Sequence, residues 1–78
     1  SYASLKKGLE EQNGEEAFRA AHTLKGVCQN LGFDNLYEVS FDITEKLRGR
    51  DTDGCEELFA KVTEQYEKTT DAIRMMED

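Results

Sequence analysis

Apolar residues recur along the chain at alternating spacings of three and four positions, the pattern of α-helices that bury one face. Four segments show it: residues 2–12, 15–31 and 34–48, and a fourth that follows Asp53 and runs to about Met75. Few of the alternating apolar and polar runs typical of strands are present. The sequence therefore predicts an all-α domain.

Each predicted helix carries one continuous apolar stripe, which we expect to face the core. The stripes of the first two helices comprise Tyr2, Leu5, Leu9, Ala17, Ala21, Leu24, Cys28 and Leu31. Those of the last two comprise Leu36, Val39 or Ser40, Ile43, Leu47, Cys55, Leu58, Phe59, Val62, Tyr66, Thr69, Ile73 and Met76. Tyr37 and Phe41 lie on a second face of the third helix.

Capping residues mark the helix boundaries. Asn13 and Glu16, and again Asp53 and Glu56, have the spacing of a capping box. Gly32 follows the last apolar position of the second helix and is expected at its C′ position. Because the connections are short, neighbouring helices should run antiparallel. We therefore predict an antiparallel up-down four-helix bundle.

Length and charge limit the classes of function. The 78 residues suffice for a single domain over residues 1–78, and a domain this small buries only about 60% of the surface of its unfolded chain. It therefore has no room for a large catalytic cavity. The net charge of −7 and the pI of about 4.6 argue against nucleic acid and against an anionic membrane surface as partners.

Targeting and redox features indicate the cytoplasm. No apolar run approaches the roughly 20 residues of a membrane span, and no signal-like segment opens the chain. We expect Cys28 and Cys55, the two cysteines, to be reduced, since two thiols make no disulfide framework. One histidine and two distant cysteines lack the spacing of metal ligands. We therefore expect a cytoplasmic protein without a metal site.

The candidate chemistry centres on His22, the one histidine of the chain. On a helix, His22, Lys25, Gly26 and Gln29 fall at i, i+3, i+4 and i+7 and share one stripe, with Phe18 one turn before. Neutral imidazole is a nucleophile, and its attack on an acyl-phosphate would leave a phosphohistidine. Lys25 would pair with the phosphoryl group, Gln29 would donate a hydrogen bond, and Gly26 would let another molecule approach.

The facing residue follows from helix geometry. His22 lies ten residues before Gly32, and ten residues into the third helix from Asp34 reaches Thr44. At the same rise per residue, Thr44 should lie level with His22. Either its hydroxyl or the carboxylate of Glu45 would hold the non-reacting ring nitrogen and select the tautomer.

Plainer interpretations apply to the same residues. A lone histidine is most often structural, a lone lysine is usually a solvated charge, and Gly26 would also suit close helix packing. Phe18 and Phe41 are more often core or boundary residues than docking residues. The chain has no phosphate-binding loop and no magnesium-binding cluster, so a hydrolase or metalloenzyme is disfavoured. A partner would have to supply metal and catalytic groups.

The run Ala21-His22-Thr23-Leu24-Lys25-Gly26 resembles the motif of histidine-containing phosphotransfer (HPt) domains. The similarity continues in the segment 30–33, which resembles the family's turn, and in Leu47-Arg48-Gly49, which resembles the end of its next helix. It covers residues 15–50, about the middle half of the chain.

The resemblance implies a phosphocarrier of a two-component phosphorelay, not an enzyme. His22 would take phosphate from a receiver-domain aspartate and pass it to another, with Lys25 stabilising the phosphoryl group and Gly26 giving the receiver access. Phe18, Lys25, Gly26, Gln29 and Phe41 would form the docking surface. The implied partners are response-regulator receiver domains and a histidine kinase; the domain needs no cofactor, and Mg²⁺ enters only through the partner. A monomer is the simplest expectation.

Two departures from the family keep alternatives open. The first is Thr44, which stands where members often carry glutamate or glutamine. The second is the short segment before the second helix, which suggests that an N-terminal helix of the family is missing from this sequence. One alternative is the phosphoacceptor domain of a chemotaxis-type histidine kinase, which the run 18–23 also resembles. Another is a receiver-binding module that carries no phosphate.

Overall fold

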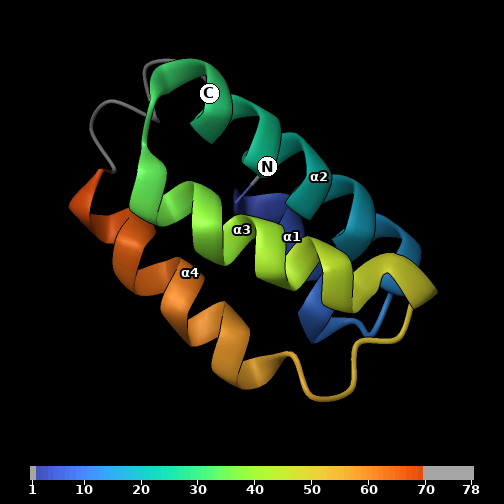
Figure 1. The fold of residues 1–78 in the computed structure, drawn as a ribbon. Helices are drawn as coiled ribbons and strands as arrows, with labels where there is room; N and C mark the ends of the chain where they lie inside the picture. The colour runs from blue at the N-terminus through green and yellow to red at the C-terminus, as the bar shows by residue number, and fades with distance from the viewer. Residues whose placement is uncertain (1, 70–78) are drawn as a thin grey trace.

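The computed structural model describes residues 2–69, which form four α-helices and one 3₁₀ turn and contain no strand. The elements are α1 (Tyr2–Glu10), α2 (Gly14–Leu31), α3 (Asp34–Lys46), η1 (Leu47–Gly49) and α4 (Glu56–Lys68) (Figure 1). This confirms the all-α prediction.

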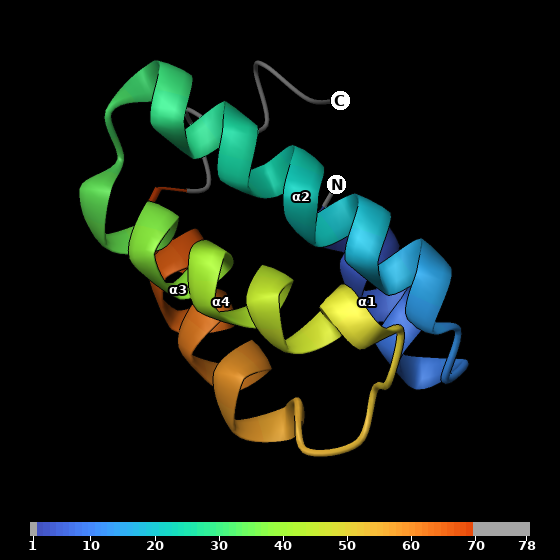
Figure 2. The same ribbon diagram turned by 45° about the vertical axis from the view of Figure 1, so that its right-hand side comes forward.

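Helix α2 is the longest element and packs against both α1 and α3, while α3 also packs against α4. Figure 2 shows α2 and α3 side by side, joined by a tight connection, with α1 behind the first half of α2. The pairing of α2 with α3 runs in reverse order: Lys25 meets Phe41, and Phe18 meets Arg48. His22 lies three residues before Lys25, and Thr44 lies three residues after Phe41. The two residues therefore occupy corresponding positions on the paired segments, in agreement with the predicted register.

The buried core residues come from the predicted stripes except Ala20, which was on no predicted stripe, while Leu31 of the second stripe is only half-buried. The buried apolar residues of the core are Leu5, Ala17, Ala20, Ala21, Leu24, Cys28, Leu36, Ile43, Leu47, Cys55 and Val62. Of the alternatives at the second position of the third stripe, Ser40 is buried and Val39 is half-buried. The small alanine side chains of α2 let its neighbours pack closely, so this helix is held on two sides.

Two of the three predicted caps are confirmed. The side chain of Asn13 accepts a hydrogen bond from the backbone N–H of Glu16 at 3.2 Å. Gly32 adopts the left-handed conformation (φ 75°), and its N–H bonds to the carbonyl of Cys28. The cap at Asp53 was wrong. Helix α4 begins at Glu56, so Cys55 and not Asp53 occupies the N-cap position, and no side chain caps the helix. The carboxylate of Asp51 accepts the Asp53 N–H that Glu56 would accept in a capping box.

Two predicted helix ends were too late. Helix α1 ends at Glu10, because Gln12 turns into the left-handed region (φ 55°) and the N–H of Asn13 bonds back to Gly8. Helix α3 ends at Lys46, and the chain tightens into the 3₁₀ turn. The predicted end at Met75 and the stripe positions Ile73 and Met76 lie outside the described residues.

Helices α1 and α4 meet through aromatic side chains. The ring of Tyr2 stacks on Tyr66, with 4.1 Å between centroids, and on Phe59, with 5.5 Å. The Tyr2 hydroxyl also shares a 2.7 Å hydrogen bond with Thr63. These contacts join α1 to α4, two helices that lie far apart in the sequence.

Candidate functional site

His22 lies in the middle of α2 and is exposed to solvent. Its neighbours Ala21 and Leu24 face the core and are fully buried. Helical geometry therefore turns the imidazole outward, on the stripe that also carries half-buried Lys25 and exposed Gln29. Within residues 2–69 the imidazole makes no hydrogen bond, so its nitrogens are accessible to a visiting group.

Gly26 leaves open space next to His22. Within residues 2–69, a Cβ atom added at Gly26 would have no neighbour within 4 Å apart from its chain neighbours and the backbone of its own helix. None of the described helices packs closely against this glycine, so close packing among them does not explain it. Glycine inside a helix costs about 1 kcal/mol relative to alanine, and no contact among the described residues accounts for that cost.

Lys25 and Phe41 pair across the α2–α3 interface. The Lys25 Nζ lies 5.3 Å from the centroid of the Phe41 ring, within the range of a cation–π contact. Phe41 is 42% exposed, the one large apolar side chain that is exposed in the described part of the chain. The interpretation of Phe41 as a core residue is therefore wrong: an apolar ring and a cation lie together at the surface, one turn after His22.

Phe18 forms a second cation–aromatic cluster, one turn before His22. The guanidinium carbon of Arg50 lies 4.0 Å from the Phe18 ring centroid, and that of Arg48 lies 5.9 Å from it. The rings of Phe18 and His22 are 6.2 Å apart, tilted by 46°. On each side of His22, therefore, an aromatic ring contacts a cation: Phe18 contacts Arg50 on one side, and Phe41 contacts Lys25 on the other.

The backbone around Arg50 holds its side chain in place. Arg50 adopts the left-handed conformation (φ 64°), its N–H bonds to the carbonyl of Leu47 at 2.7 Å, and its Nη1 donates to the carbonyl of Arg48 at 2.6 Å. Gly14 lies against the Arg50 backbone so closely that an added Cβ would overlap the Arg50 carbonyl. The start of α2 and the end of the 3₁₀ turn therefore touch without intervening side chains.

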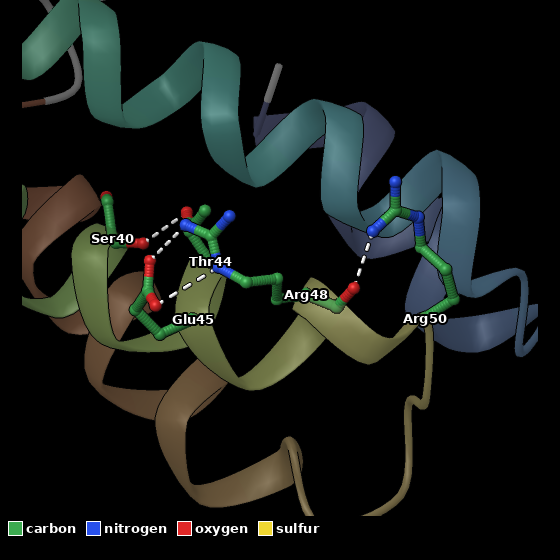
Figure 3. Close-up of polar contacts among 5 residues, drawn as sticks. All are labelled: Ser40, Thr44, Glu45, Arg48 and Arg50. Atoms are coloured by element: carbon green, nitrogen blue, oxygen red, sulfur yellow. Dashed lines mark hydrogen bonds and ion pairs between the residues drawn. The ribbon is translucent and has the colours of Figure 1, made fainter.

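The side chains that face α2 from α3 are already engaged (Figure 3). Thr44 is fully buried, and its hydroxyl donates to the carbonyl of Ser40 at 2.6 Å. Glu45 accepts two hydrogen bonds from Arg48, at 3.2 and 2.5 Å. Neither Thr44 nor Glu45 makes a hydrogen bond to His22 within the described residues. The Ser40 hydroxyl oxygen is buried with no hydrogen-bond partner in this part of the chain.

The charge of Glu45 is stabilised by its surroundings. The hydrogen bond from Arg48 lowers the pKa of this exposed carboxyl most; desolvation opposes it, and the positive charges of Arg48 and Lys25 lower the pKa further. Glu45 therefore remains an anion near neutral pH and neutralises Arg48. The contribution of Lys25 to this shift indicates that Lys25, Glu45 and Arg48 share one electrostatic neighbourhood.

Cys28 and Cys55 are both buried and form no disulfide within residues 2–69. Burial raises the pKa of the Cys55 thiol, which disfavours the reactive thiolate. In residues 2–69, no three His, Cys, Asp or Glu side chains lie together as metal ligands. Among the helices described, none is both long and apolar enough to cross a membrane.

Arg48 and Arg50 were missed as site residues. In the sequence Arg48 ends the predicted third helix and Arg50 follows it, and the helix dipole alone would explain two cations at this end. Their contact with Phe18 joins segments that are far apart in the chain, and neither periodicity nor spacing indicates it. Within the predicted stripe, Phe18, Lys25, Gly26 and Gln29 do lie together with His22 on one face of α2.

Comparison with known proteins identifies the family. The family model of the Hpt domain matches residues 2–75, nearly the whole chain. No curated protein and no solved structure matches the chain. Hpt domains act in histidine phosphotransfer in phosphorelay signalling, as phosphocarriers and not as enzymes, and they interact with receiver domains and kinases. The fold, the exposed histidine stripe and this match agree: the chain belongs to the Hpt domain family.

Proposed function

We propose that His22 is the phosphoacceptor of a multistep phosphorelay, taking a phosphoryl group from the aspartate of one receiver domain and passing it to another. The observation that carries this proposal is the solvent-exposed imidazole beside the open surface at Gly26, with Lys25 one turn away. A receiver must bring its aspartyl phosphate into contact with the imidazole, and this is the face of α2 where no side chain obstructs the approach.

The chemistry is a reversible displacement at phosphorus. A neutral ring nitrogen of His22 attacks the aspartyl phosphate, a P–N bond forms, the P–O bond breaks, and the aspartate leaves as a carboxylate. The phosphorylated ring then carries its proton on the other nitrogen. Lys25 balances the negative phosphoryl oxygens as a flexible point charge, and Gln29 adds a hydrogen bond. The partner supplies Mg²⁺ and the remaining catalytic groups.

During phosphotransfer Thr44 or Glu45 would hold the second ring nitrogen, a contact that neither makes in the described residues. The Thr44 hydroxyl already donates its proton to Ser40, so toward the imidazole it can only accept. An acceptor at this place favours the tautomer with its N–H toward α3 and leaves the outward nitrogen as nucleophile. Glu45 would serve in the same way after partly releasing Arg48.

Phe18, Phe41 and Gln29 complete a docking surface around Lys25 and Gly26. We also propose that the four helices form an antiparallel up-down bundle, which the reversed pairing of α2 with the segment that begins at α3 supports. One chain presents one such surface, so we expect a monomer to bind one receiver at a time.

The test is phosphate acceptance by the wild-type chain and by His22→Gln. Each is mixed with phosphorylated receiver domains, and acid-labile, alkali-stable phosphate on the chain is measured. We expect label on the wild type and none on the variant, whose folding is checked by circular dichroism. Equal label on a folded His22→Gln chain would refute the assignment.

Two further outcomes separate the alternatives. Label that arises only from a histidine kinase and ATP, and never from a receiver, would assign the domain to the kinase type. Receiver binding without any label would assign it as a receiver-binding module.

A further inference from the structure

We propose that Arg50, together with Lys25, forms a pair of cationic contacts that selects receiver domains with an acidic surface around their phosphorylated aspartate. The inference rests on the proposed phosphotransfer at His22. It adds a specificity-determining residue, Arg50, from outside the histidine helix, and it names the surface chemistry of the partner.

The first support is the position of Arg50. Its guanidinium carbon lies 4.0 Å from the centroid of the Phe18 ring, and Phe18 is the residue one turn before His22. Lys25 lies on Phe41 on the other side of His22. The two cations therefore flank the imidazole, and a partner that reaches His22 must come close to both.

The second support is that Arg50 is held in place. The left-handed backbone conformation, the hydrogen bond from Nη1 to the Arg48 carbonyl and the direct contact with Gly14 together fix where its side chain leaves the chain. A side chain that is already ordered loses less conformational freedom when a partner binds.

The third support is the distribution of charge. The chain has a net charge of −7, yet the surface around His22 carries Lys25, Arg48 and Arg50. Glu45 neutralises Arg48. Neither Lys25 nor Arg50 forms an ion pair with any carboxylate in residues 2–69. The charge of Lys25 also acts on Glu45, but neither Lys25 nor Arg50 is held in an ion pair there, so both cations can pair with a carboxylate of the partner.

An acidic partner is the complement of this arrangement. The donor presents a phosphorylated carboxylate, so its reacting surface is negative before any neighbouring side chain is counted. The overall negative charge of this chain repels such a partner, and local cations at the docking face counteract the repulsion and orient the encounter. Attraction between exposed charges acts mainly on the association rate and weakens as salt screens it.

The experiment measures phosphoryl transfer between the wild-type chain and a panel of receiver domains that differ in surface charge. The variant is Arg50→Gln, and the matched control is Lys61→Gln. The control removes one charge from exposed Lys61 on α4, which lies on the far side of α3 from α2 in both ribbon views. Second-order rate constants are recorded at about 20 mM and about 500 mM salt, where the screening lengths differ severalfold.

We expect Arg50→Gln to slow transfer from the most acidic receivers about three- to tenfold at low salt, and less than twofold at high salt. Lys61→Gln should stay within about twofold of the wild type at both salt concentrations. Arg50→Lys keeps the charge and should restore most of the low-salt rate. A merely structural role of Arg50 would produce a loss that neither salt nor lysine changes, and that result would overturn the inference.

A second measurement separates this inference from the proposed function. Phosphoramidate is a small phosphodonor that needs no docking surface, so it should label His22 equally in the wild type and in Arg50→Gln. Equal labelling and equal transfer rates from every receiver would refute the role of Arg50 while leaving the phosphoacceptor intact. Failure of the wild type to accept phosphate from any receiver would refute both.

Discussion

Helix α2 contains two glycines, Gly14 at its start and Gly26 after His22, and their surroundings are opposite. At Gly14 an added Cβ would overlap the carbonyl of Arg50 and would lie 2.9 Å from its Cα atom. At Gly26 the same atom would meet nothing within 4 Å. The first glycine admits a segment of the chain itself, and the second leaves space that no other described residue fills.

The difference shows how to distinguish structural from functional glycines on one helix. Gly14 has a contact that explains it, because it lets the 3₁₀ turn reach α2 and brings Arg50 to Phe18. Gly26 has a cost in helix stability and no compensating contact among the described residues. Substitutions at the two positions should therefore separate stability from phosphotransfer.

The largest effect is expected for Gly26→Gln. Its side chain would project beside His22 and displace the receiver, and an error of about 1 Å in a reacting pair can cost about a hundredfold in rate. We expect transfer to fall by about that factor while the free energy of unfolding rises by about 0.5 kcal/mol, since glutamine is the better helix former. Stopped-flow transfer assays and urea denaturation measure the two quantities.

Gly26→Ala is the matched control for this substitution. Its Cβ enters open space, so stability should rise by about 1 kcal/mol with transfer close to the wild-type rate. Undiminished transfer in Gly26→Gln would contradict the assignment of this surface to the receiver.

The next effect is expected for Gly14→Ala. Because the new methyl group would overlap the Arg50 backbone, the turn must move, and overpacking of this kind typically costs about 1–3 kcal/mol. Denaturant unfolding should show a loss of that size, accompanied by partial loss of the salt-dependent transfer rate as Arg50 leaves Phe18. Gly49→Ala is the control, since a Cβ at Gly49 has no neighbour within 4 Å; an equal loss there would contradict the contact explanation.

The smallest effect is expected for Lys25→Ala, beside Gly26 on the open surface. Loss of one partly exposed charge contact is worth about 1 kcal/mol at most, so transfer should slow about fivefold and the phosphohistidine should hydrolyse faster. The free energy of unfolding should fall by less than about 1 kcal/mol, the value of the contact with Phe41. Lys61→Ala is the control, and phosphohistidine half-lives at neutral pH provide the measurement. An unchanged half-life would remove Lys25 from phosphate stabilisation.

Much of the site was predictable because it lies on one helix. The stripe of Phe18, His22, Lys25 and Gln29 needs only the 3.6-residue period, and the buried seam beside it fixes which way the stripe faces. The register that places Thr44 level with His22 needs only equal rise along two helices joined by a tight turn, and it agrees with the observed contact of Lys25 with Phe41.

Helix ends and loop contacts were less predictable. The cap expected at Asp53 has the right spacing, but Asp51 satisfies the Asp53 N–H within the loop and α4 begins at Glu56. Local spacing cannot decide between two carboxylates that compete for the same backbone donors. The end of α1 was also hard to predict, because Gln12 adopts the left-handed conformation, which glycine usually marks in a sequence.

The sequence by itself determined the all-α class, the exposed histidine stripe and the apolar seam, because helical periodicity is a local property. Only the tertiary structure decided what Arg50, Gly14 and Thr44 do. Each of these residues acts through a contact that periodicity does not encode: Arg50 on Phe18, Gly14 on the turn backbone, and the Thr44 hydroxyl on the Ser40 carbonyl. The packing of α2 against α3 and the turn that follows it, together with the burial of Thr44, sets these contacts.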